Sequence, residues 1–446
     1  MRVAIIGSGP AGFYAAEALL KRTDVRVDVD MFDRLPTPYG LVRGGVAPDH
    51  PKIKAVARVF ASTAARPTFR FLGNVQLGRD VTVEDLRRHY HRIVYATGNE
   101  ADRRLGIPGE GIWRCTPASV FVGWYNGHPD YRGARFDLSV PRVAVVGNGN
   151  VAVDVCRILL RTPEELARTD VAEHALAALR ESRVREVWML GRRGPAQAAF
   201  TPPELRELGA LEDADPIVDP AELADAGQGP PGGNLEILRA FAARRPRPGT
   251  RRLHLRFLAS PAEILADPSG AVAGMALERN RLEARPGGGV VARGTGELER
   301  LDVQMVLTAV GYAGVEIPGV PHDERTHTIA NVDGRVVDPV HRTVIPGEYV
   351  VGWARSGPQG LIGEHKKASA HVVAHMIEDA AGAEARALPP REAIDALLRE
   401  RGVRFVSFDD WRRLDEVEVA RGERRGAPRD KIVDVQAMLE ILSDEP

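Results

Sequence analysis

The chain alternates short apolar runs with longer segments of helical period, and two of these alternations share one pattern. In the first, the run Val3–Ile6 leads through a glycine-rich turn into an Ala- and Leu-rich segment that extends to Leu20. In the second, Val143–Val146 leads through a similar turn into "NVAVDVCRILL". A short β-branched run is typical of a buried parallel strand, and the segment after it of a helix. The pattern predicts an α/β fold with two strand–turn–helix units.

The turn of the first unit carries a G-x-G-x-x-G motif, "GSGPAG". In this motif the first glycine allows a tight turn, the second lets a pyrophosphate approach the backbone, and the third lets the helix pack on the strand. The next apolar run, "VRVDVDMF", is followed by an acidic residue about 20 positions past the last glycine, where such a side chain usually binds a ribose hydroxyl. We therefore predict a dinucleotide site formed by Gly7, Gly9, Pro10, Ala11, Gly12 and Asp33.

The turn of the second unit, "GNGNVA", has alanine at the third glycine position. The apolar run that follows, "VREVWML", ends in no acidic residue but in a glycine and the pair Arg192 and Arg193. Taken alone, an arginine pair is more often a solvated strand end. Beside a second dinucleotide turn, two guanidinium groups suit the 2′-phosphate of NADP, and an acid suits a ribose hydroxyl. The predicted cofactors are FAD in the first unit and NADP in the second.

Composition narrows the class of protein. With 446 residues, 27% of them charged and 44% hydrophobic, the chain is long enough for two or three globular domains. A net charge of −1 gives no general attraction to nucleic acids or acidic membranes. The only cysteines, Cys115 and Cys156, cannot hold an iron–sulfur cluster or form a C-x-x-C pair, although one disulfide is conceivable. No run is long enough for a signal peptide or a membrane span, so we expect a cytoplasmic protein.

Several longer stretches resemble one family. The chain is similar to ferredoxin/adrenodoxin–NADP reductases of the adrenodoxin-reductase type, and the similarity runs from the N-terminus almost to the C-terminus. The stretches that carry it are "PYGLVRGGVAPDHPKIKAV" (38–56), "GNVQLGRDVTVEDL" (73–86), "FVGWYNGHPD" (121–130), "GRRGPAQAAFTPPELREL" (191–208), "GWARSGPQGLIG" (352–363) and "RGVRFVSFDDWRRLDEVEVARGE" (401–423).

The resemblance implies an FAD-containing NADPH:ferredoxin oxidoreductase, and it implies roles for individual residues. His50 and Glu207 correspond to a histidine and a glutamate that the family places near the flavin ring. Further flavin-binding positions are implied at Ala11, Asp33, Gly40, Leu41, Leu77, Gly98, Trp353, Gly360, Leu361 and Ile362. The NADP-binding positions implied are Gly147, Asn148, Gly149, Asn150, Val151, Arg192, Arg193 and Glu204, with Gly360 between the flavin and the nicotinamide.

Two strands ending in glycine turns, "IVYATGN" (93–99) and "MVLTAVGYAG" (305–314), are typical of crossings between two nucleotide domains. We expect an FAD domain of residues 1–104 and 312–446, with an NADP domain of residues 105–311 inserted in it. The expected electron acceptor is a small acidic iron–sulfur protein of the ferredoxin type, attracted by basic side chains; the candidates are Arg157, Arg161, Arg251 and Arg252.

The sequence departs from the family pattern at three places near the expected flavin: "ARSGPQG" (354–360), "EHKKASA" (364–370) and Gly44. These changes bear on nicotinamide access, redox potential and partner choice more than on the fold. Two alternatives to a ferredoxin reductase stay open. One is a flavin-dependent NADPH oxidase or monooxygenase that acts on a small substrate. The other is a nucleotide-binding regulator without catalysis.

Overall fold

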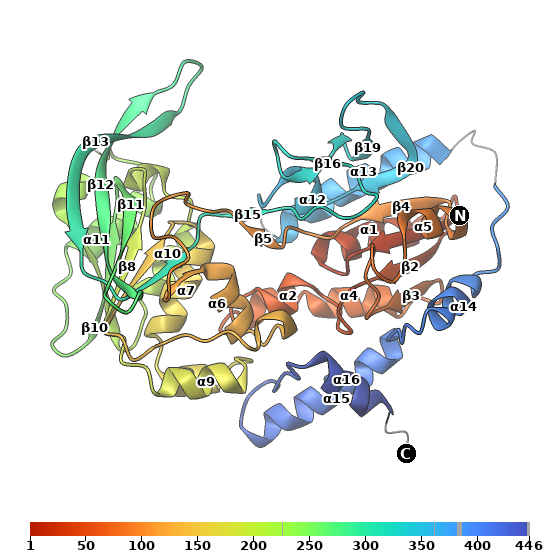
Figure 1. The fold of residues 1–446 in the computed structure, drawn as a ribbon, viewed down its shortest axis with the longest axis horizontal. Helices are drawn as coiled ribbons and strands as arrows, with labels where there is room; N and C mark the ends of the chain where they lie inside the picture. Colours follow the sequence, from red (N-terminus) through yellow and green to blue (C-terminus); the bar gives the residue numbers. More distant parts are fainter. Residues whose placement is uncertain (225, 361, 381–385, 444–446) are drawn as a thin grey trace.

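The computed structural model of the chain describes residues 1–224, 226–360, 362–380 and 386–443. The chain forms two bodies, each built on a mainly parallel sheet (Figure 1). We call the body on the seven-stranded sheet the first body and that on the six-stranded sheet the second body. The predicted α/β fold with two dinucleotide-binding units is confirmed.

The sheet of the first body draws its strands from both ends of the chain. Its four N-terminal strands pair in parallel, β20 joins β4 in parallel, and β19 and β18 extend that edge in antiparallel pairing. In sheet order the strands are β18 (Asn331–Val332), β19 (Arg335–Val337), β20 (Val344–Val350), β4 (Arg92–Tyr95), β1 (Arg2–Ile6), β2 (Asp28–Phe32) and β3 (Phe69–Leu72).

Helices cover the first body's sheet. On one face α1 packs against α4 and α13 over a core that includes Phe13, Val29 and Val372. The helices of this body are α1 (Pro10–Leu20), α2 (Leu41–Gly44), α3 (Pro51–Lys54), α4 (Ala57–Ala64), α5 (Val83–His89), α12 (Trp353–Ser356), α13 (His365–Ala380) and α14 (Ala393–Glu400). The hairpin of β16 (His322–Asp323) and β17 (Thr328–Ile329) also belongs to it. Two C-terminal helices, α15 (Phe408–Arg424) and α16 (Val435–Ser443), lie along the lower side in Figure 1.

The second body has two sheets. Its parallel sheet has the order β6 (Cys115–Pro117), β14 (Met305–Thr308), β7 (Arg142–Val146), β8 (Glu186–Leu190), β10 (Arg251–Arg256) and β9 (Ala214–Val218). A second, antiparallel sheet consists of β11 (Ala259–Ala266), β12 (Val272–Ala284) and β13 (Val290–Leu301). It buries Ile264, Met275 and Leu277 against Val146 and Leu190 of the parallel sheet. The hydrophobic pattern of the sequence did not predict this layer.

Helices cover the other face of the second body's parallel sheet. They are α6 (Ala118–Tyr125), α7 (Asn150–Leu160), α8 (Pro163–Ala167), α9 (Glu173–Arg180), α10 (Pro202–Leu208) and α11 (Asn234–Ala242). The segment 162–182, which has a continuous helical pattern, is split into α8 and α9. The break contains Asp170, whose carboxylate accepts hydrogen bonds from Lys54 (2.8 Å) and forms an ion pair with Lys431 (3.1 Å). These buried contacts join the two bodies and the C-terminal segment.

The two bodies are linked by two crossings that run side by side. Strand β5 (Ala101–Asp102) pairs with β15 (Tyr312–Ala313) in an antiparallel ribbon, and Figure 1 shows this ribbon between the bodies. The expected crossings after β4 and β14 therefore meet each other. Both cysteines are buried and unpaired. Within the described ranges no helix is long and apolar enough to span a membrane.

Candidate active site

The first dinucleotide turn lies between β1 and α1 and has the features that a pyrophosphate needs. Gly7 has a φ of 104°, and a side chain there would place its Cβ 2.4 Å from the carbonyl oxygen of Ala96, which follows β4. At Gly9 a Cβ would meet no atom within 4 Å. The helix that follows has no side-chain cap, so its first N–H groups are available to an anion. The turn therefore offers a cradle of open backbone.

Asp33 directly follows β2, as predicted, and its carboxylate is held in place. The backbone N–H of Ser8 donates to Asp33 Oδ2 at 2.9 Å, and the Ser8 hydroxyl donates to the same oxygen. The backbone N–H of Leu35 donates to Oδ1 at 2.9 Å. These bonds orient an acceptor next to the glycine turn, where a ribose hydroxyl binds in such folds. The first cradle and Asp33 thus fit FAD.

The second dinucleotide turn repeats the first. Gly147 has a φ of 138°, and a Cβ there would lie 2.3 Å from the carbonyl oxygen of Ala309, which follows β14. Gly149 borders open space, and α7 has no side-chain cap. The buried Asn148 Nδ2 has no hydrogen-bond partner among the described residues. Asn150 Oδ1 accepts from the N–H of Thr201, which ties the turn to the start of α10.

Arg192 and Arg193 lie where β8 ends, beside the second turn. Asn280 Nδ2 donates to the Arg192 carbonyl oxygen at 2.8 Å, and the Leu258 N–H donates to that of Arg193 at 3.1 Å. In the part of the chain that the structure describes, neither guanidinium group has an ion pair or hydrogen bond. Two oriented but unpaired cations next to an open glycine turn fit a phosphate group, and so this cradle fits NADP.

His50 of the first body contacts α10 of the second body. His50 Nε2 lies 2.9 Å from Glu207 Oε2 and 3.6 Å from Glu204 Oε2, although His50 and Glu207 are 157 positions apart in the chain. His50 is the residue before α3 in the first body, whereas both glutamates are on α10 of the second. The fold therefore brings together the two residues that the resemblance placed near the flavin.

Arg157 on α7 is the charged centre of this contact, and it corrects one expectation. Its fully buried guanidinium lies 3.2 Å from Glu207, 3.6 Å from Glu204, and donates to Asp49 at 2.6 Å and to Asp154 at 2.7 Å. Arg161 also donates to Asp49 at 2.6 Å. Both arginines were expected on a partner-binding surface. For Arg157 that expectation is wrong, because the carboxylates of Asp49, Glu204 and Glu207, all distant in the sequence, hold it in the interface between the bodies. Arg161 is partly exposed but is paired with Asp49.

The other two arginines expected on that surface are also paired. Arg251, mostly buried, forms an ion pair with Asp213 at 3.3 Å, and Arg252 forms one with Asp215 at 3.4 Å. Strand β10 places both next to acidic residues at the start of β9.

The carboxylates around Arg157 respond to burial and charge in different ways. Burial opposes ionisation of Asp49, but the hydrogen bond and charge of Arg157 dominate and lower its pKa to about 2. Burial raises the pKa of Asp154 to about 6 despite the nearby Arg157. Burial likewise raises the pKa of Glu204, whose buried Oε2 accepts no hydrogen bond among the described residues. The site thus holds a firmly ionised carboxylate beside two that take up protons more readily.

The remaining predicted flavin residues belong to the first body. Trp353, partly buried, stacks on Tyr312 with ring centroids 5.6 Å apart, and its indole N–H donates to the Gln359 carbonyl oxygen at 3.1 Å. Leu77 is buried and Leu41 is exposed. Gly40, Gly98 and Gly360 all have φ values in the left-handed region, and Gly98 borders open space. Ile362 packs against the first body's core, and Leu361 lies outside the described residues.

Comparison with known proteins identifies the family. The chain is 45% identical to the NADPH-ferredoxin reductase FprA of Mycobacterium tuberculosis over 456 residues, which cover 98% of each chain. It is 44% identical to the human mitochondrial NADPH:adrenodoxin oxidoreductase over 462 residues, 99% of this chain and 92% of the human one. The chain belongs to the ferredoxin/adrenodoxin–NADP reductase family.

The structures of this reductase family agree with the assignment. The M. tuberculosis FprA structure in complex with NADPH superimposes with a TM-score of 0.94 at 44% identity, covering 99% of both chains. The family model of pyridine nucleotide-disulphide oxidoreductases matches residues 1–187. In this reductase the two cysteines are buried and unpaired, which fits the absence of a C-x-x-C pair from its sequence.

Proposed function

We propose that the chain is an NADPH:ferredoxin oxidoreductase: it oxidises NADPH by removal of a hydride and reduces two molecules of a one-electron iron–sulfur protein. The observation that carries this proposal is the pair of dinucleotide cradles, one with Asp33 and one with two unpaired arginines, in two bodies that are in contact through His50 and Glu207. FAD, when bound, would accept the hydride and release its electrons singly. The family relatives, which are named for NADPH and ferredoxin or adrenodoxin, support it.

The chain's own residues supply binding and alignment. FAD would be held by the first cradle together with Asp33, Gly40, Leu41, Leu77, Gly98 and Trp353. NADPH would be held by the second cradle together with Arg192 and Arg193. His50 and Glu207 would hold a proton between them at His50 Nε2 and orient the two cofactors, with Glu204 beside them. Arg157 lies 3.6 Å from Glu204 and 3.2 Å from Glu207 and attracts both carboxylates to the side of the histidine. Hydride transfer itself requires little acid–base catalysis, so alignment is the main contribution of the protein.

The division into domains supports this function. We place the FAD domain at residues 1–104 and 312–446 and the NADP domain at 105–311. The two sheets support these limits, since the first body takes its strands from outside residues 105–311 and the second from inside. The cytoplasm is the proposed location, supported by two cysteines that stay unpaired.

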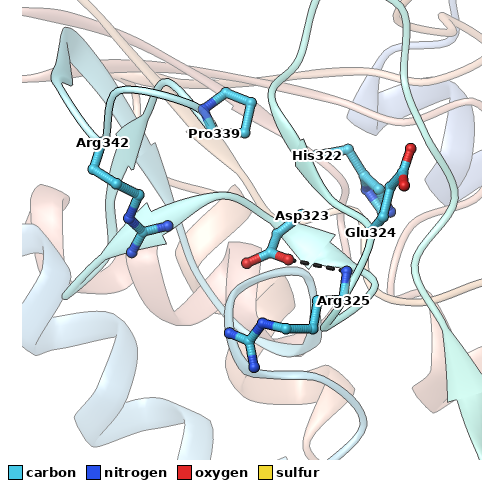
Figure 2. A pocket seen from close by; sticks show the side chains of 6 residues that line it. All are labelled: His322, Asp323, Glu324, Arg325, Pro339 and Arg342. Carbon is cyan, nitrogen blue, oxygen red and sulfur yellow. Dashed lines mark hydrogen bonds between the residues drawn. The ribbon is translucent and has the colours of Figure 1, made fainter.

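The proposed acceptor is an acidic ferredoxin-type protein, and a basic rim on the ribbon between the bodies fits it. An open depression there is lined by Asp102, Arg103, Arg104, Ala313, Arg325 and His327. The side chains of Arg104 and Arg325 are exposed and have no partner among the described residues, whereas Asp102 accepts from Ser119. Figure 2 shows the adjoining depression, which Arg325 and Arg342 help to line.

This rim also lies next to the expected flavin wall. Arg103 Nε donates to the Tyr312 carbonyl oxygen at 3.1 Å, and the Tyr312 ring stacks on Trp353. A negatively charged partner seated here would be steered by charge and would approach the flavin edge.

The central experiment is anaerobic mixing of the FAD-loaded chain with NADPH, followed by addition of candidate ferredoxins. We expect the yellow colour to bleach and to return as ferredoxin is reduced. A purified chain that takes up no FAD contradicts the proposal. NADPH consumption that yields an organic product without ferredoxin supports a monooxygenase instead, and a flavin that NADPH does not bleach supports a regulator.

The docking rim has its own test. The double variant Arg104→Gln/Arg325→Gln is expected to lower the ferredoxin-dependent kcat/KM and to flatten its dependence on ionic strength, with bleaching by NADPH unchanged. The exposed Arg285→Gln at the far tip of the β12–β13 hairpin is the control. A wild-type rate that does not change with salt contradicts charge-steered docking.

A further inference from the structure

Two histidines and an aspartate meet on the first body, away from the His50 contact. His371 and His375 lie on α13, and Asp333 lies in the turn between β18 and β19. His371 Nε2 is 3.0 Å and His375 Nε2 is 3.5 Å from Asp333 Oδ2. One ligand atom from each residue lies within 4.8 Å of the other two. None of the three residues has a role in the proposed reduction of ferredoxin.

The local sequence explains why these side chains converge. Residues four apart on a helix lie on one face, so His371 and His375 point to the same side of α13. The turn packs closely on that helix at the intervening residue, because a Cβ on Gly334 would lie 2.5 Å from Val372 Cγ2. Asp333 itself has a φ of 47°. The turn thereby presents its carboxylate to the two imidazoles.

Hydrogen bonds leave one ligand atom on each side chain facing the others. His375 Nδ1 lies 3.2 Å from the Asp333 carbonyl oxygen, and a proton on Nδ1 leaves the lone pair on Nε2. Arg355 donates to Asp333 Oδ1 at 2.8 Å, so Oδ2 is the oxygen turned to the histidines. Such outer hydrogen bonds to an imidazole and a carboxylate are those that orient ligands in metal sites.

The spacing suits a small divalent ion. Zinc binds histidine nitrogen and carboxylate oxygen at about 2.0–2.2 Å in tetrahedral geometry, which separates ligand atoms by roughly 3.4 Å. The two observed nitrogen–oxygen distances, 3.0 and 3.5 Å, lie on either side of that value. We propose that Asp333, His371 and His375 bind a zinc-class divalent transition ion through two imidazole nitrogens and one carboxylate oxygen, with water as the fourth ligand.

The other histidine–carboxylate group, His50 with Glu204 and Glu207, is a poorer metal site. There Arg157 lies 3.2 and 3.6 Å from the two carboxylates, so a positive charge already occupies the position of a cation. At Asp333 the arginine contacts only the oxygen that faces away from the histidines.

A metal ion at Asp333 would connect three elements of the first body. It would tie the β18–β19 turn to α13, and through Arg355 it would also reach α12, which carries Trp353. Because the ion binds the folded arrangement of ligands, it should raise the thermal midpoint of the protein.

The test is calorimetric titration of the untagged, FAD-loaded protein with zinc chloride after treatment with a chelator. We expect saturable binding of one ion and a higher thermal midpoint with zinc. His371→Ala, His375→Ala and Asp333→Asn should each weaken binding about tenfold or more. Asp333 and His371 are exposed and His375 is partly buried, and the thermal midpoint without metal shows whether each variant folds. His341→Ala, an exposed histidine of the same body, should bind like the wild type.

Three results would overturn the proposal. The first is that the wild type shows no saturable zinc binding. The second is that the His371→Ala/His375→Ala double variant binds zinc as well as the wild type does. The third is that zinc binding is lost only in His50→Gln. Bleaching by NADPH is measured separately, so failure of the metal site leaves the reductase proposal standing.

Discussion

Arg192 and Arg193 show how much a single side chain's role depends on what surrounds it. Both guanidinium groups are without a partner among the described residues, although their backbones are fixed by Asn280 and Leu258. Arg157, an equally ordinary arginine in the sequence, is fully buried among four carboxylates. Arg192 and Arg193 are therefore available to bind a ligand, whereas Arg157 stabilises the interface between the two bodies.

Replacing Arg192 and Arg193 together by leucine should raise the KM for NADPH strongly and that for NADH little. Each lost charge-assisted bond of about 1.5–3 kcal/mol weakens binding about 10–150-fold. Steady-state kinetics with both nucleotides measures this. Arg183→Leu, an exposed arginine just before β8, is the control. Equal effects on NADPH and NADH would argue against a 2′-phosphate site.

His50→Ala should slow flavin reduction by less than about 100-fold rather than abolish it, because hydride transfer depends mainly on alignment. Stopped-flow bleaching by NADPH measures the rate. His50 and Glu207 are in contact, so the double variant His50→Ala/Glu207→Gln should be little slower than His50→Ala alone. Additive losses would show that the two side chains act separately.

At the scale of elements, each dinucleotide turn depends on its glycines in two ways. Some allow the close approach of protein backbone, as at Gly12, where a Cβ would lie 2.2 Å from the Gly7 carbonyl oxygen. Others leave room for a ligand, as at Gly9, where a Cβ would meet nothing within 4 Å. The first kind serves the packing of α1 on β1, and the second serves the cofactor.

This difference predicts opposite behaviour of two similar variants. Gly12→Ala should lower the thermal midpoint of the FAD-free protein, since the methyl group forces α1 away from β1. Gly9→Ala should leave that midpoint unchanged and weaken FAD retention. Gly133→Ala, at an exposed glycine with open surroundings, is the control. Thermal unfolding before and after FAD removal, with fluorescence of released flavin, separates the two effects. A Gly9→Ala protein that retains FAD like the wild type would contradict this assignment.

At the scale of the whole molecule, ion pairs join the two bodies next to the site. Asp49 of the first body accepts from Arg157 and Arg161 of α7 in the second. Lys54 and Lys431 share Asp170 nearby, and burial lowers the pKa of both lysines. Such contacts set the spacing between the two cradles, on which alignment of two cofactors depends.

Asp49 makes this interface sensitive to acid. Its pKa of about 2 lies below the ordinary value near 4, so its stabilisation is complete above pH 4 and is lost as pH falls toward 2. A pKa shift of this size corresponds to a contribution of about 2 kcal/mol to the free energy of unfolding. Asp49→Asn should lower the free energy of unfolding by at least that amount at neutral pH, and the difference from the wild type should shrink in acid.

Urea unfolding of both proteins at a series of decreasing pH values measures the difference. Asp409→Asn, at a highly exposed carboxylate, is the matched control and should change little. A deficit in Asp49→Asn that stays constant down to the lowest pH at which both proteins fold would contradict a role for the carboxylate charge.

The two dinucleotide units, Asp33 and the arginine pair could be predicted from the sequence alone. These features are local: a strand, a glycine turn and a helix are encoded in about 30 consecutive residues. Through the family resemblance, the sequence also indicated His50 and Glu207 as residues near the flavin ring. The long antiparallel sheet of β11, β12 and β13 escaped notice because β13 is mostly exposed and carries little apolar alternation.

Contacts between residues far apart in the chain are visible only in the folded protein. The fold places His50 against Glu207, buries Arg157 beside Asp49, pairs Arg161 with the same carboxylate, and brings Asp333 to His371 and His375. Charge pairs and metal ligands require a few ångströms of separation between side chains from different elements. The spacing of residues along the chain does not encode these short distances. The packing of the two bodies creates them at His50 and Asp49, and the packing of the β18–β19 turn on α13 creates them at Asp333.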